Sequence, residues 1–117
     1  GLYDLARCIE KHSPPDAVIG SFNAGIISYY SHRPTVNLDG VMNDSVIPAI
    51  VEKRLAEYLD REGIGYLADM RGEIERFMAG FGGDPDWLSK WQVVYEIECP
   101  WGGGIGTVPM VIMQRRE

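Results

Sequence analysis

Short apolar runs of strand length alternate with helical patterns through the first two thirds of this chain, and this order constrains its fold more than any other feature. Residues 17–22 are apolar without alternation, which is typical of a strand buried on both faces of a parallel sheet. Residues 35–39 and 64–69 form two further strand patterns. Helical patterns separate the strands, at 2–12, 24–31, 47–62 and 71–79. Because crossover connections are right-handed, we expect three parallel strands side by side.

The last third of the chain has a different pattern. From Trp91 to Cys99, apolar residues alternate with polar ones, which predicts a strand with one buried face. Thr107 to Arg115 predicts a final strand antiparallel to it. With 117 residues, we expect one soluble domain over 1–117, of class α/β. Its predicted architecture is three-layer α/β/α, with a mostly parallel, Rossmann-like sheet and an antiparallel C-terminal hairpin.

Charge and apolar patterning exclude several classes of function. The net charge is -6 and there is no basic stripe, so the main electrostatic term of nucleic-acid binding is missing. The wholly apolar runs are far shorter than the roughly 20 residues of a membrane span. Two alternatives stay open for Cys8 and Cys99, a disulfide in an oxidising compartment or two small buried side chains.

Polar residues follow each of the three predicted parallel strands. Ligands of open α/β sheets bind beyond the carboxyl ends of such strands, so we expect these residues to share one rim and to bind a polyhydroxyl or cationic ligand. The candidate ligand-binding residues are Ser21, Asn23, Asp39, Asn43 and Asp69. The alternative is that they only cap helices and close turns. Two glycines are expected to be structural, Gly25 through close packing of helix on strand and Gly40 through a positive φ.

Other local features predict turns, loops or packing positions and no functional site. Residues 102–106 are glycine-rich but lack the Lys-Ser/Thr of a phosphate loop, which favours a hairpin connection. Trp101 in this connection is expected to pack at the core or its rim, the alternative being contact with a partner or lipid headgroups. His12 and His32 lie beside prolines and are expected at surface turns. We therefore predict no catalytic residue and no metal ligand.

Three segments together resemble a known family. They are Ala17–Ser31, Thr35–Asn43 and Tyr66–Asp69, and the similarity is strongest at Phe22-Asn23-Ala24-Gly25 and Asn37-Leu38-Asp39-Gly40. They are similar to the soluble C-terminal domain of polytopic membrane proteins related to dolichyl-phosphate-mannose protein mannosyltransferases. The resemblance covers about residues 2–70, and many relatives carry Trp where Phe22 stands. Residues 84–117 match no family that we recognise.

The resemblance implies a location, a parent reaction and partners. The chain would be a piece from the C-terminal end of a larger membrane protein, on the extracytoplasmic face of the membrane. It would be an accessory domain, not catalytic by itself, of a glycosyltransferase that uses a polyprenyl-phosphate-linked sugar. Its partners would be the membrane-embedded part of the same chain and a lipid-linked sugar or acceptor. No cofactor is implied in these residues, whereas the parent reaction implies a divalent metal ion.

Two further functions stay open at the level of the sequence. One is a free-standing small α/β module or enzyme acting on a small polar metabolite, and the other is a purely structural docking domain.

Overall fold

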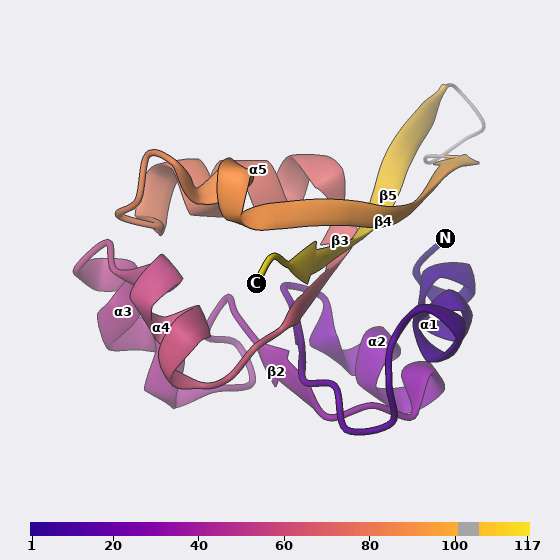
Figure 1. The fold of residues 1–117 in the computed structure, drawn as a ribbon, viewed down its shortest axis with the longest axis horizontal. Coiled ribbons are helices and arrows are strands. Elements are labelled where there is room, and N and C mark those ends of the chain that lie inside the picture. Colours follow the sequence, from indigo (N-terminus) through magenta and orange to yellow (C-terminus); the bar gives the residue numbers. More distant parts are fainter. Residues whose placement is uncertain (101–105) are drawn as a thin grey trace.

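The computed structural model describes residues 1–100 and 106–117, and these form a mixed α/β fold around a single open sheet (Figure 1). The strands within this part of the chain are β1 (Ile19–Ser21), β2 (Thr35–Asn37), β3 (Tyr66–Met70), β4 (Trp91–Pro100) and β5 (Thr107–Arg115). The helices are α1 (Leu2–His12), α2 (Ala24–Ser31), α3 (Ile47–Val51), α4 (Leu55–Arg61) and α5 (Arg71–Phe81), with short 3-10 helices η1 (Asp44–Val46) and η2 (Trp87–Lys90).

The strand order is β2-β1-β3-β5-β4. β1 is parallel to both β2 and β3, which confirms the predicted parallel trio. β5 is antiparallel to both β3 and β4, which confirms the predicted C-terminal hairpin. The prediction that the sheet is mostly parallel is wrong, because two of the four pairings in the described residues are antiparallel and they involve the longest strands.

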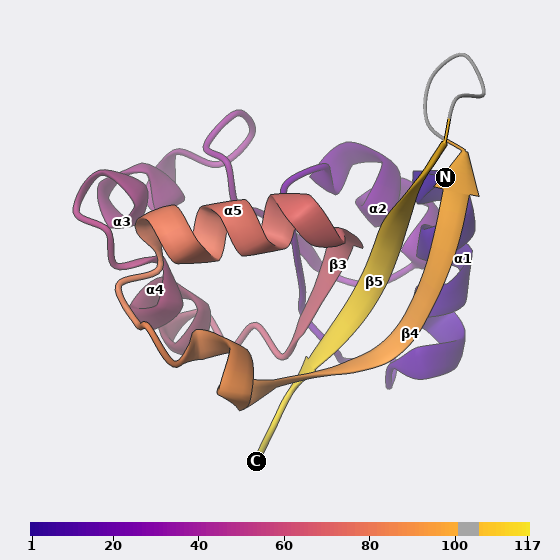
Figure 2. The ribbon, with the colours of Figure 1, turned by 90° about the horizontal axis from the view of Figure 1, so that it is seen from above.

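Alternate residues of β3 and β5 face two separate hydrophobic clusters. Leu67 and Val111 belong to a cluster with the side chains of α4 and α5. Ala68 and Ile112 belong to a second cluster with those of α1 and α2. Figures 1 and 2 show the two groups of helices on opposite sides of the sheet. The central strands are therefore buried on both faces, as their continuous apolar character predicted.

The single helix predicted over residues 47–62 is wrong, because the chain leaves the helical conformation between α3 and α4. Lys53 adopts a left-handed φ of 57°. The amide of Ala56, in the first turn of α4, donates to the carbonyl of Gly82, 3.0 Å away. Contact with the turn after α5 thus replaces the helical hydrogen bonds that a continuous helix would make at this point.

The expectation that α2 is largely covered by neighbours is also wrong. Only Ala24, Ile27 and Ser31 of this helix are buried, whereas Ile26 and Tyr29 are exposed, Tyr29 to 75%. α2 lies near the open side of the sheet, beside edge strand β2, so one flank of the helix has no neighbour to cover it.

β4 does not keep one buried face, contrary to the alternating pattern. A bulge between Val93 and Tyr95 shifts its register against β5. Trp91, before the bulge, packs with the cluster beside α4 and α5, whereas Tyr95 and Cys99, after it, face the cluster beside α1. One inserted residue moves all subsequent side chains to the other face of a strand, which alternation in the sequence does not reveal.

Two glycine predictions have opposite outcomes. Gly40 has a φ of 86°, as predicted. Gly25 does not mediate close packing, since a Cβ built there would meet no atom within 4 Å. The close approach is instead at Gly20 in β1, where a Cβ would lie 2.9 Å from Leu38 Cδ1 and about as near to two other side chains.

The remaining sequence predictions concern the cysteines and the hairpin connection. Cys8 and Cys99 are both free thiols, Cys99 buried and Cys8 half-buried. Trp101 and most of the glycine-rich connection, residues 101–105, lie outside the described residues. Within the described ranges, no helix combines the length and apolar character needed to cross a bilayer.

Candidate functional site

Asp69, at the end of β3, is the centre of a buried polar cluster. Its side chain is fully buried, and its Oδ2 accepts hydrogen bonds from Ser21 Oγ at 3.0 Å and from the backbone amides of Phe22 and Asn23 at 2.9 and 3.0 Å. Its Oδ1 accepts from Asn23 Nδ2 at 2.8 Å and from the Met70 amide at 2.7 Å. Five donors therefore converge on one carboxyl group.

The cluster joins the first turn of α2 to β3. Asn23 is the N-cap residue of α2, but its own side chain does not cap the helix. The carboxylate of Asp69 accepts from the Asn23 amide, just ahead of the first helical residue, and negative charge at a helix N-terminus is favourable. Asp69 thus fixes the start of α2 to β3 through the N-cap residue Asn23.

Two opposing effects act on the ionisation of Asp69. Burial, the larger effect, raises its pKa above the usual range of an aspartate. The amide of Met70, the side chains of Asn23 and Ser21 and the amide of Phe22 act in the opposite direction, because each donates to the ionised form. Each carboxylate oxygen accepts at least two hydrogen bonds from the protein. These contacts give Asp69 a structural role.

Three of the five predicted site residues, Ser21, Asn23 and Asp69, are therefore brought together in contact. In the described part of the chain, no buried side-chain nitrogen or oxygen lacks a hydrogen-bond partner. The cluster is consistent with the alternative of helix capping, which the sequence left open, and it leaves no buried acceptor directed at a ligand.

The other two predicted residues lie on the segment after β2. Asp39 is half-buried and accepts the Val41 amide through Oδ1 at 2.9 Å. Asn43 donates through Nδ2 to the Asn37 carbonyl and to the Tyr58 hydroxyl, both at 2.9 Å. Ser45 Oγ completes this second cluster, 2.9 Å from the Tyr58 hydroxyl.

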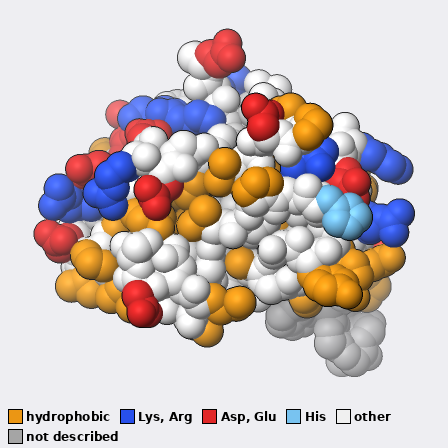
Figure 3. All heavy atoms as spheres, turned by 90° about the horizontal axis from the view of Figure 1, so that it is seen from below, with side chains coloured by type: hydrophobic (Ala, Val, Ile, Leu, Met, Phe, Trp, Pro, Cys, Tyr) orange, Lys and Arg blue, Asp and Glu red, His pale blue; other side chains and the backbone are white. Residues whose placement is uncertain are grey.

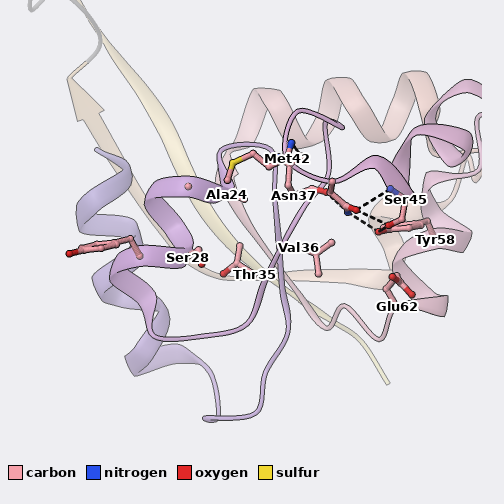
Figure 4. Close-up of a pocket in the computed structure, with 12 residues that line it drawn as sticks. Ala24, Ser28, Thr35, Val36, Asn37, Met42, Ser45, Tyr58 and Glu62 are labelled. Atoms are coloured by element: carbon pink, nitrogen blue, oxygen red, sulfur yellow. Dashed lines mark hydrogen bonds between the residues drawn. The ribbon is translucent and has the colours of Figure 1, made fainter.

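A groove of about 500 Å³ runs along the free edge of β2, between α2 and α4. We call it the edge groove. Figure 4 shows Thr35, Val36 and Asn37 lining it, with Ser28 on one side and Tyr58 on the other. Among its lining residues the only charged one is Glu62, so the groove presents mainly neutral hydrogen-bonding groups.

A second groove of about 300 Å³ lies at the carboxyl ends of the strands. We call it the rim groove. Two predicted site residues, Asn23 and Asp39, line it together. Its other lining side chains are largely apolar, and Val41 and Met42 are 80% and 70% exposed. Met42 and Asn37 line both grooves, so the two are contiguous.

The face that carries these grooves has little charge at its middle. Figure 3 shows hydrophobic and uncharged side chains over the centre of this face and most of the charged ones toward its margins. Exposed apolar side chains gathered in this way mark interaction sites in other proteins.

Sequence reasoning missed several residues of this region, namely Asn37, Ser45, Tyr58 and Glu62. A signal existed for two of them. The predicted strand 35–39 ends two residues earlier in the structure, at Asn37, which places this residue at the carboxyl end of β2. Tyr58 is buried on an amphipathic helix, and a buried tyrosine needs a hydrogen-bond partner for its hydroxyl.

The described residues contain no group of three or more His, Cys, Asp or Glu side chains placed to hold a metal ion. The fold and its polar regions thus define a small mixed α/β domain with a closed polar cluster at the sheet rim and two open grooves beside it.

Comparison with known sequences places the chain in a family. The profile of the family described as "Domain of unknown function (DUF8728)" matches residues 2–112, and the chain belongs to this family. No curated protein sequence matches the chain.

Proposed function

We propose that this domain is a non-catalytic accessory domain of an integral-membrane glycosyltransferase that uses a polyprenyl-phosphate-linked sugar. In this proposal it lies on the extracytoplasmic side, contacts the membrane-embedded part of the same chain and helps to form the entrance for the lipid-linked sugar or its acceptor. The reaction itself, and the divalent metal ion that it implies, belong to the membrane part. The sequence resemblance at Phe22-Asn23-Ala24-Gly25 and Asn37-Leu38-Asp39-Gly40 supports this assignment.

The observation that carries the proposal is the mixed character of the rim groove. Asn23 and Asp39 provide hydrogen-bonding groups at the carboxyl ends of the strands, while Ile26, Val41 and Met42 expose aliphatic surface in the same groove. A ligand with hydroxyl groups beside a hydrocarbon chain satisfies both kinds of surface. Each exposed aliphatic side chain that such a ligand covers contributes in proportion to its apolar area.

The finer fold assignment is part of the same proposal. Helices on both sides of a sheet whose first three strands are parallel support a three-layer, Rossmann-like arrangement with an added antiparallel hairpin. In such sheets the carboxyl ends of the parallel strands hold the ligand, which is the position of the rim groove.

The test is binding of a short-chain analogue, citronellyl-phosphate mannose, to the 117-residue chain, followed by amide chemical shifts in NMR spectra. We expect the amides of Asn23, Val41 and Met42 to shift and expect no turnover. Val41→Ser is expected to weaken binding about fivefold, since it removes roughly 1 kcal/mol of apolar contact.

Leu88→Ser is the matched control, because Leu88 is also exposed but lies on η2, outside both grooves. Binding that Leu88→Ser weakens as much as Val41→Ser does would contradict the rim groove as the site. Turnover of the analogue by this domain alone would contradict a non-catalytic role.

A second candidate function is a free-standing module that binds a small polar metabolite. The edge groove favours it, since about 500 Å³ lies within the usual size range of small-molecule sites. The reading frame upstream of Leu2 discriminates between the two candidates. Several apolar stretches of about 20 residues support the membrane protein, and a start codon nearby supports the free-standing module.

A further inference from the structure

We infer that the edge groove binds an extended polypeptide segment of a partner, which adds to β2 as a further strand of the sheet. The inference concerns a different groove surface and a different ligand class from the proposed function and does not depend on it. It rests on the main-chain groups of β2 and on what surrounds them.

β2 is at one end of the sheet and pairs only with β1 in the described part of the chain. The Ile19 amide donates to the Pro34 carbonyl at 2.8 Å, and the Leu38 amide donates to the Ser21 carbonyl at 3.0 Å. Successive residues of a parallel strand direct their main-chain groups to alternate sides. Pro34, Val36 and Leu38 therefore face β1, and Thr35 and Asn37 face the groove.

One of these outward groups already has a partner that resembles a neighbouring strand. The Asn37 carbonyl accepts Asn43 Nδ2 at 2.9 Å, so a side-chain amide occupies the position of a main-chain donor. The N–H and carbonyl of Thr35 and the N–H of Asn37 are the remaining outward groups. They repeat at about 6.6 Å, the spacing of every second residue in a strand.

Only another extended chain offers donors and acceptors with this repeat. The edge groove also leaves room for one, because Gly25 on its α2 side has no side chain and a Cβ there would meet nothing within 4 Å. β2 is protected as an edge by its length of three residues and by Pro34 before it, but it carries neither a lysine nor a bulge that would block a further strand. Strand addition at such an edge is an established mode of peptide recognition.

The charge of the edge groove favours some extended segments over others. Glu62 is the single charged residue that lines the groove, and the chain has a net charge of -6. A segment with β-branched residues and one lysine matches both the main-chain edge and this carboxylate, whereas an acidic segment is repelled.

The probe is the peptide acetyl-Thr-Val-Lys-Val-Thr-amide, titrated into the 117-residue chain and followed by amide chemical shifts. We expect the Thr35 and Asn37 amides to shift most, since both donate to the new strand, and the inward-facing Val36 amide to shift less. No binding at roughly 10 mM peptide, or shifts that leave Thr35 and Asn37 unchanged, would overturn the inference.

Thr35→Pro tests the protein side. It removes an outward N–H, leaves the ladder bonds of Val36 to β1 intact and is expected to weaken binding at least about tenfold. Thr35→Val keeps both the N–H and the branched shape and is expected to bind within about twofold of the unaltered chain. Equal affinities of the two variants would contradict strand addition.

A ligand-side control does not depend on how the variants fold. The same peptide N-methylated at all five residues cannot donate from either set of alternate positions and is expected to lose at least about tenfold in affinity. Unchanged affinity after N-methylation would overturn the inference. If the mannose analogue binds and the unmodified peptide does not, strand addition is contradicted and the proposed function stands. If the unmodified peptide binds and the mannose analogue does not, the proposed function is contradicted and strand addition stands.

Discussion

Asp69, near the end of β3, and Asp39, just after β2, lie at the carboxyl ends of parallel strands, yet their surroundings differ completely. Asp69 is fully buried and accepts five hydrogen bonds from β1, from the connection between β1 and α2, and from its neighbour in β3. Asp39 is half-buried and accepts one, from the amide of Val41 two residues later. A carboxylate that the protein satisfies completely holds the fold together, whereas one with a single local partner keeps acceptor capacity for a ligand.

Replacing each carboxylate in turn tests this difference. We expect Asp69→Ala to lower the free energy of unfolding by about 3 kcal/mol, because the Phe22 amide and the Ser21 hydroxyl lose their acceptor in a buried site and the Asn23 amide keeps only Ser21 Oγ. Urea denaturation measures the change.

Asp39→Ala is the matched variant and is expected to cost only about 0.5 kcal/mol, since the Val41 amide is exposed and water replaces the lost acceptor. Equal losses for the two variants would mean that burial does not separate the roles of the two residues.

Gly20 and Gly25 differ in how closely other side chains approach them. Gly20→Ala is expected to cost about 1–3 kcal/mol, because its Cβ would lie 2.9–3.1 Å from the side chains of Leu38, Ile64 and Leu67. Gly25→Ala places a Cβ in open space within a helix and is expected to stabilise by about 0.5 kcal/mol. Thermal unfolding followed by circular dichroism compares them, and a destabilised Gly25→Ala would refute the open space beside α2.

The second polar cluster, on the groove side, is expected to matter less than the first. Tyr58→Phe removes the hydroxyl that contacts Asn43 Nδ2 and Ser45 Oγ, and we expect a loss of about 1 kcal/mol. Hydrogen exchange of the Ser45 amide should accelerate, since it donates to the Asn43 side chain that Tyr58 orients. Unchanged exchange would show that the segment after β2 is ordered by other contacts.

The smallest expected effect is the pH dependence that comes from Asp69. Because burial raises its pKa, the folded state holds the proton more tightly than the unfolded chain does. The stability contributed by Asp69 is therefore fully present below the ordinary pKa of an aspartate and falls as the pH rises through the raised value. Exposed Glu57 and half-buried Asp84, whose pKa values are lowered, act in the opposite sense.

Comparison with Asp69→Asn isolates this contribution, since the other carboxylates are common to both proteins. Urea midpoints at a series of acidic pH values should show the difference in stability between the unaltered chain and the variant decreasing as the pH rises. An increasing difference would mean that the five donors outweigh burial.

Local patterns predicted much of this fold because the spacing of apolar residues in the central strands and amphipathic helices indicates which side chains are buried. The parallel direction of β1, β2 and β3 follows from the alternation of strands and helices, and the C-terminal hairpin follows from an alternating run and a final apolar run that the loop between them joins. What failed depends on contacts between distant segments. The interruption at Lys53 requires the turn after α5, and the bulge at Val94 becomes visible only in the register with β5.

The candidate site divides in the same way. The rule that ligands bind beyond the carboxyl ends of strands located Ser21, Asn23 and Asp69 near one another, but it could not show that they satisfy each other. The edge groove was missed because its floor is main chain, and no side-chain pattern marks an unpaired strand edge.

The link between Asp69 and α2 also bears on how the chain acquires its structure during synthesis. The acceptor for the Asn23 amide is 46 residues further along the chain, so the start of α2 leaves the ribosome well before its partner is made. Until β3 has been synthesised and has docked beside β1, the Asn23 amide has only the hydroxyl of Ser21, two residues earlier, and water as acceptors. The start of α2 therefore reaches its final set of hydrogen bonds only after β3 has been synthesised. A chain truncated before Asp69 should be cleaved readily by a protease at residues 21–24.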